Sequence, residues 1–126
     1  MKKIIFAIGF CFLLVGFGGH RILAKISDVL HPDEIYIFTQ ATCHHCWDAE
    51  DFLRDEYPDL KVQKRDIADS KNRVLFFACG AKFKLDQAKM GTPLFCMGDH
   101  YIMGWGRSER KKFNEYVKEF LPELQK

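Results

Sequence analysis

The passage that decides the fold is IYIFTQATCHHC, residues 35–46. Its first five residues are all β-branched or aromatic, a composition typical of a strand buried on both faces. A short turn follows, and the apolar positions of residues 43–56 then recur mainly along one stripe, which predicts a helix that ends before Pro58. The passage therefore predicts a buried strand that leads directly into a helix opened by two cysteines.

The spacing of Cys43 and Cys46 suits a reversible disulfide. Residues three apart on a helix have Cα atoms about 5–6 Å apart, inside the ~4.4–6.8 Å that a disulfide spans. Cys43 opens the helix, where unpaired N–H groups and the positive end of the helix dipole favour a thiolate. Cys46 lies one turn deeper. We predict that Cys43 is the nucleophile and Cys46 the resolving thiol.

The two residues between the cysteines, His44 and His45, bear on the redox potential. Each imidazole can donate an N–H bond, or positive charge when protonated, toward the Cys43 sulfur. Stabilising the thiolate stabilises the reduced protein, which makes the disulfide a stronger oxidant. We expect a potential of about −180 to −120 mV, above the value of about −270 mV typical of thioredoxin.

The chain beyond residue 58 alternates short strands and helices. A strand–helix–strand crossover needs a parallel pair of strands, whereas a hairpin needs an antiparallel one. The predicted fold class is therefore α/β, a mixed four-stranded sheet with helices on both faces. We expect an edge strand within 60–67, a helix over 70–78 that Gly80 interrupts, a further turn over 83–88, a hairpin of strands 94–97 and 100–103, and a last helix that Ser108 caps and Pro122 ends.

A second motif, Gly91-Thr92-Pro93, opens the strand 94–97. Proline is tolerated at the first position of a strand, where its missing N–H would be unpaired. A cis Thr92–Pro93 bond would expose the Thr92 backbone beside Cys43, so that an extended substrate could pair with it as a strand. Trp47 and Trp105 flank this region; they form an apolar rim for a peptide, or Trp47 packs on its own helix.

These motifs together resemble the glutaredoxin branch of the thioredoxin superfamily, over about residues 34–121. The resemblance is carried by FTQATCHHC (38–46), Asp66-Ile67, GTPLF (91–95) and the hairpin that ends at Gly104. It implies a thioredoxin-like fold in which Cys43 attacks, Cys46 is its partner and Pro93 is a cis-proline facing them. The CHHC motif, with histidine just before the second cysteine, is similar to that of protein disulfide isomerases and periplasmic dithiol oxidases.

The chain departs from these families at two places. Glutaredoxins usually continue the hairpin with Gly-Gly and an acidic residue that helps to hold glutathione, whereas this chain has Met103-Gly104-Trp105-Gly106-Arg107-Ser108. This departure argues against a glutathione site. Thioredoxins carry a buried carboxylate six residues before the first cysteine, where this chain has Ile37. The sequence therefore names no proton acceptor for Cys46.

Metal binding is the main alternative to redox chemistry. Cys43, His44, His45 and Cys46 are all residue types that bind Zn²⁺ or Cu⁺. Four consecutive residues at the start of a helix cannot all converge on one ion, so a metal site would need further ligands such as Cys79, Cys96 or His100. A disulfide with only a structural role, or an interaction module, is a third interpretation. We expect no metal and no cofactor.

Cys79 and Cys96 allow two interpretations. They form a second disulfide, or both are buried free thiols that pack as small apolar side chains. Four cysteines in one domain allow three pairings.

The first residues indicate export. Lys2 and Lys3 precede an apolar run that resembles the core of a secretory signal, at a length borderline for a membrane span. We divide the chain into a signal peptide or membrane anchor (1–24), a linker or short helix (25–33) and a thioredoxin/glutaredoxin-like domain (34–126). The whole chain has 19 Lys+Arg and 17 Asp+Glu, with no basic stripe, so we expect no nucleic-acid partner.

The function that we expect is thiol–disulfide exchange on protein substrates outside the cytoplasm. Export favours oxidase or isomerase activity over reduction, because disulfides persist in oxidising compartments. The expected location is periplasmic or otherwise exported, with a tether to the inner membrane if residues 1–24 are retained. A membrane redox partner is then a further expectation.

Overall fold

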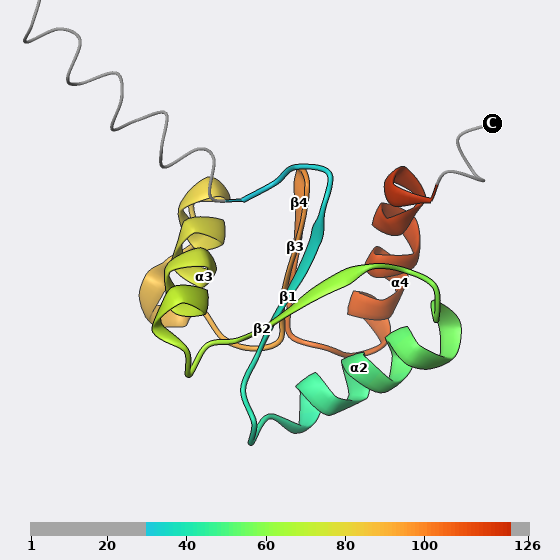
Figure 1. The fold of residues 1–126 in the computed structure, drawn as a ribbon, viewed down its shortest axis with the longest axis horizontal. Coiled ribbons are helices and arrows are strands. Elements are labelled where there is room, and N and C mark those ends of the chain that lie inside the picture. Colours follow the sequence, from blue (N-terminus) through green and yellow to red (C-terminus); the bar gives the residue numbers. More distant parts are fainter. Residues whose placement is uncertain (1–29, 122–126) are drawn as a thin grey trace, which may run out of the picture.

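The computed structural model describes residues 30–121, which form a sheet with helices on both faces (Figure 1). The strands are β1 (Ile35–Thr39), β2 (Val62–Asp66), β3 (Leu94–Met97) and β4 (His100–Met103). The helices are α2 (His44–Glu56), α3 (Ser70–Lys82) and α4 (Arg107–Tyr116), with 3₁₀ turns at Gln87–Lys89 and Val117–Phe120. The predicted α/β class and the mixed four-stranded sheet are confirmed.

In the strand order β2-β1-β3-β4, β1 and β3 are the two central strands. β1 runs parallel to β2, with Ile37 opposite Lys64, and antiparallel to β3, with Ile37 opposite Phe95. The end of β1 therefore lies beside the start of β3. This arrangement brings the first turn of α2 close to Thr92 and Pro93.

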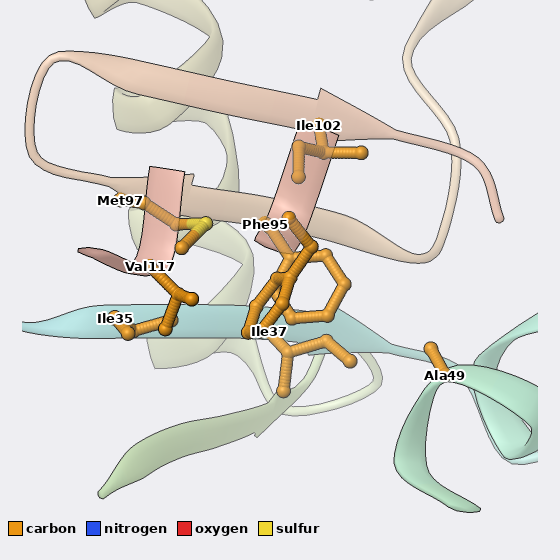
Figure 2. Packing of buried hydrophobic residues seen from close by; sticks show 8 residues of the cluster. Ile35, Ile37, Ala49, Phe95, Met97, Ile102 and Val117 are labelled. Atoms are coloured by element: carbon orange, nitrogen blue, oxygen red, sulfur yellow. The ribbon is translucent and has the colours of Figure 1, made fainter. Parts of the chain in front are cut away.

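Two apolar clusters hold the helices on the sheet, because alternate residues of each strand point to opposite faces. In Figure 2, Ile35, Ile37 and Phe95 pack toward Ala49 of α2 and toward Val117, which follows α4. On the other face a second cluster packs beneath α3. Its buried members are Tyr36, Phe38, Phe76, Cys79, Leu94 and Cys96. The sheet is thus the middle of three layers (Figure 1).

Two predicted element boundaries are wrong. Gly80 does not interrupt α3, which continues to Lys82. Gly80 is buried, and a Cβ atom there would overlap the side chain of Met90, so the glycine serves close packing. Ser108 does not cap the last helix; Gly106 is the N-cap, so Ser108 lies inside the first turn of α4.

The predictions for the N-terminal region lie largely outside the described residues. This holds for the signal peptide or anchor at 1–24 and for residues 25–29 of the proposed linker. Among the described residues the first strand, β1, begins at Ile35. The predicted division of the chain into three segments stays a prediction. Within residues 30–121, none of the helices has the length and apolar character needed to cross a membrane.

Candidate active site

Cys43 is the N-cap residue of α2, and its sulfur takes the place of the oxygen that usually caps a helix. Its backbone is extended (φ −92°, ψ 105°), and its Sγ accepts the backbone N–H of Cys46 at 3.1 Å. The two cysteines form a disulfide, with Cα atoms 5.2 Å apart as the spacing predicts. A negative charge that developed on this sulfur would meet an N–H donor and the positive end of the helix dipole.

The two sulfurs differ in access. Cys43 is partly exposed, whereas Cys46 is 1% exposed and is covered by the rest of the domain. An incoming thiolate can therefore reach only the Cys43 side of the bond. This asymmetry agrees with the predicted roles of Cys43 as nucleophile and Cys46 as resolving thiol.

Thr92 lies beside Cys43 and is joined to Pro93 by a cis peptide bond. The Thr92–Pro93 peptide bond is cis, and the Thr92 carbonyl oxygen is 3.6 Å from Cys43 Sγ. Pro93 is fully buried, and its carbonyl oxygen accepts the N–H of Gly104 at 2.8 Å. The Thr92 hydroxyl donates to Gln40 Oε1 at 3.4 Å. This hydrogen bond joins the residue after β1 to the segment that precedes β3. The structure thus places Thr92, one of the four predicted substrate-binding residues, beside Cys43, with Pro93 next to it across the cis bond.

His44 and His45 are both exposed and face different surroundings. The His44 ring meets the Trp47 ring edge-on, with centroids 4.5 Å apart. Trp47 keeps 46% of its surface exposed, so it both packs on its own helix and presents an apolar face beside the site. Its role in substrate binding stays a prediction.

Trp105 lies deeper than an exposed rim residue. Its ring packs against Phe52 and Phe95, with centroids 5.2 Å and 5.5 Å away, and so joins the apolar cluster beneath α2 and α4. Its remaining surface lines a groove of about 490 Å³ that also includes His45. The other residues of the groove are Asp48, Asp51, Phe52, Asp55, Glu56, Gly106 and Arg110.

An ion pair beneath α2 was not predicted from the sequence. Glu50 Oε1 lies 2.8 Å from Lys64 Nζ on β2. This oxygen is buried and makes no hydrogen bond with suitable geometry to the described residues. Glu50 is four residues after Cys46 and therefore lies on the same side of the helix, which is the feature of the sequence that could have drawn attention to it.

Cys79 of α3 and Cys96 of β3 form a second disulfide, with Cα atoms 6.2 Å apart. Their exposed fractions are 0% and 3%. This result decides between the two interpretations of these residues. Because neither sulfur is accessible, the second disulfide is a structural link between the helix and the sheet.

The metal alternative gains no support from the geometry. Across residues 30–121, no three His, Cys, Asp or Glu side chains are grouped so that they could hold a metal ion. Cys79 and Cys96, which the alternative would use as extra ligands, are bonded to each other.

Comparison with known proteins supports the fold. No family model and no curated protein matches the sequence. A crystal structure of a glutaredoxin from Archaeoglobus fulgidus matches with a TM-score of 0.52 and 17% sequence identity, over 68% of this chain and 86% of the glutaredoxin. At this identity the match shows the fold alone. The chain has a thioredoxin-like fold, as the sequence resemblance implied.

Proposed function

We propose that this chain is a thiol–disulfide oxidoreductase that exchanges disulfides with protein substrates through Cys43 and Cys46. The observation that carries the proposal is the disulfide at the start of α2, whose accessible sulfur already accepts the Cys46 N–H at 3.1 Å. A disulfide that closes so short a loop contributes less to stability than one that closes a longer loop, so a purely structural role accounts less well for this pair. A pair with one accessible and one buried sulfur is instead suited to a two-step exchange.

In the oxidising direction, a substrate thiolate attacks Cys43 Sγ. The Cys43–Cys46 bond breaks, Cys46 leaves with the electron pair and takes up a proton, and a mixed disulfide joins the substrate to Cys43. A second substrate thiolate then attacks the substrate sulfur of the mixed disulfide. Cys43 leaves as a thiolate that the helix N-terminus stabilises. The substrate is oxidised by two electrons, and the cysteine pair is reduced by two.

The position of Thr92 supports a proposed mode of substrate binding. Its carbonyl oxygen is 3.6 Å from Cys43 Sγ, so a peptide that paired with the Thr92 backbone would carry its own cysteine past the reactive sulfur. The exposed ring of Trp47 would cover apolar side chains of such a peptide. This mode of binding depends on main-chain hydrogen bonds more than on the side chains of the peptide, which suits an enzyme with several protein substrates.

Oxidase or isomerase activity in an exported compartment is the form of this function that we favour. His44 and His45 favour the Cys43 thiolate, and therefore an oxidising potential. The buried Cys79–Cys96 disulfide is of the kind that persists in oxidising compartments. The basic start and apolar run of residues 2–17 suit export, to the periplasm or with a tether to the inner membrane. A tethered enzyme would exchange electrons with a membrane redox partner.

A trapping experiment tests the proposal. Cys46→Ala removes the resolving thiol, so proteins attacked by Cys43 should stay attached to it and be released by dithiothreitol. The Cys43→Ala/Cys46→Ala variant is the matched control and should trap none. Several exported proteins among the captured species would support an oxidase or isomerase, and one membrane protein would support a dedicated electron relay. Equal recovery from the two variants would contradict the proposal.

A further inference from the structure

The outward side of α3 is apolar. Val74 keeps 63% of its surface exposed, and Phe77 keeps 38%. Ala78 and Ala81 follow Val74 by four and seven residues, so the four side chains form one stripe along the helix. The residues of α3 that pack on the sheet lie on the opposite side of the helix. A helix that is apolar on both sides normally has an apolar partner on both, so we expect something other than water to cover this outer stripe.

Basic residues border the outer stripe on both sides. At about 3.6 residues per turn, Lys71 and Lys82 lie along one side of it and Arg73 along the other. α3 contains no acidic residue, and the carboxylates just before it, Asp66 and Asp69, accept backbone N–H groups in the preceding turn. By contrast, α2 and α4, which cover the other face of the sheet, together have five basic and seven acidic residues. The α3 side therefore combines exposed apolar surface with positive charge.

The edge strand β4 adds exposed apolar side chains on the same side of the sheet. Tyr101 and Met103 are 39% and 37% exposed. They lie opposite Cys96 and Leu94, which belong to the cluster beneath α3, and directly opposite residues share a face of a sheet. Among residues 30–121, the large apolar side chains that stay exposed are thus on the α3 side, except Trp47 of α2.

The N-terminal end of the described chain also lies on this side. Leu30 packs against the cluster beneath α3, and the described chain begins beside α3 in Figure 1. The apolar run of residues 4–17 precedes Leu30 in the sequence. If that run holds the chain in a membrane, the domain is attached from its α3 side.

We propose that the outer stripe of α3 lies on the surface of a membrane that contains anionic lipids. Val74 and Phe77 enter the boundary between headgroups and acyl chains, and the basic residues beside them contact the lipid phosphates. Stable membrane attachment generally requires two signals, and this contact would supply the second. It goes beyond the proposed function, because it requires no thiol exchange. α2 covers the opposite face of the sheet, so the proposed orientation leaves Cys43 open to polypeptides near the membrane.

Lysine acetylation of the full chain in lipid nanodiscs tests the contact. N-hydroxysuccinimidyl acetate modifies accessible amines, and mass spectrometry gives the rate at each lysine. Lys71 reports on α3, because Lys82 Nζ already donates to the Gly98 carbonyl oxygen, and the exposed Lys111 of α4 is the internal control. One nanodisc contains phosphatidylcholine alone, and the other contains an equimolar mixture with phosphatidylglycerol.

We expect Lys71 to react about fivefold more slowly in the anionic nanodisc, the effect typical of one basic residue at an anionic surface. The rate at Lys111 should change by less than about twofold. Added salt should reduce the difference at Lys71, because it screens the attraction between lysine and lipid. Val74→Ser/Phe77→Ser removes the apolar contact and should bring the Lys71 rate close to its value in phosphatidylcholine. Arg110→Gln removes a basic residue of α4 and is the matched control, which should leave the Lys71 rate unchanged.

Three results would overturn the inference. Equal Lys71 rates of the wild-type chain in the two nanodiscs would show that anionic lipid does not cover α3. Equal slowing at Lys71 and Lys111 would show that the domain has no preferred face toward the membrane. Protection of Lys71 in detergent that increases with protein concentration would assign the outer stripe to contact between copies of the chain. None of these rates depends on disulfide exchange, so a loss of that activity would contradict the proposed function alone.

Discussion

Removing the Cys79–Cys96 disulfide should destabilise the domain about twice as much as removing the disulfide at the start of α2. The bond joins residues 17 apart in sequence. Loop-closure entropy scales as −2.1 − 1.5R ln n cal/mol/K, which for this loop gives about 3 kcal/mol at 25 °C. For a domain of about 100 residues, each kcal/mol shifts Tm by roughly 4–8 °C. We therefore expect Cys79→Ala/Cys96→Ala to lower Tm by roughly 12–25 °C.

The matched control is Cys43→Ala/Cys46→Ala, which opens a loop of residues three apart. The same relation gives about 1.6 kcal/mol for that loop, about half the effect. Both variants and the wild type would be unfolded with urea and with heat, without reductant. Two results would refute the claim that the Cys79–Cys96 disulfide stabilises the domain more than the Cys43–Cys46 disulfide. One is an equal loss of stability in the two variants, and the other is a loss of less than about 1 kcal/mol in Cys79→Ala/Cys96→Ala.

Two further predictions concern charge and protons. His44→Ala/His45→Ala should lower the reduction potential by tens of millivolts, about 30 mV for each 1.4 kcal/mol of thiolate stabilisation that is lost. The potential is measured by equilibration with a glutathione buffer. An unchanged or raised potential would contradict the prediction. Burial raises the pKa of Tyr36 above 10.0, as does its hydrogen bond to Glu34 at 2.8 Å, while the His31 N–H lowers it. The folded protein thus favours the neutral phenol of Tyr36. The contribution of Tyr36 to the free energy of unfolding should be complete below about pH 10 and should be lost as the pH rises through the pKa of Tyr36 in the folded protein. Tyr36→Phe should reduce that alkaline loss in urea titrations, and an equal loss in both proteins would rule the effect out.

Most of the secondary structure could be predicted because its signals are local. The apolar run of residues 35–39 and the cysteine-opened stripe of residues 43–56 predicted β1 and α2 almost to the residue. The predicted hairpin of strands 94–97 and 100–103 matches β3 and β4, and the tight turn between them has Gly98 at φ +59°. In these segments the backbone preference and the burial pattern agree.

The two errors arose where packing overrides local preference. Glycine weakens a helix by roughly 1 kcal/mol, so Gly80 was interpreted as a break. The structure uses it as the residue that lets Met90 approach α3, and the helix continues past it. Ser108 has the usual chemistry of an N-cap, but the chain turns into α4 two residues earlier, at Gly106.

The Glu50–Lys64 pair could not be found from the sequence, because it depends on strand register. The pairing requires that Lys64 emerge on the face that α2 covers, which follows from its position opposite Ile37 in the sheet. A shift of β2 by one residue would turn Lys64 to the other face. The pairing of Cys79 with Cys96 likewise required the packing of α3 on β3 to be known.

The central claim is that the position of Cys43 makes its thiol unusually acidic. Its Sγ accepts the Cys46 N–H at 3.1 Å at the N-terminus of α2, an arrangement that lowers a thiol pKa. The most direct test is to follow the ultraviolet absorbance of the Cys43 thiolate in Cys11→Ser/Cys46→Ala, which leaves Cys43 as the free thiol, as the pH is raised. The account predicts a midpoint clearly below the ordinary thiol pKa of about 8.5, whereas a midpoint at or above that value would contradict it.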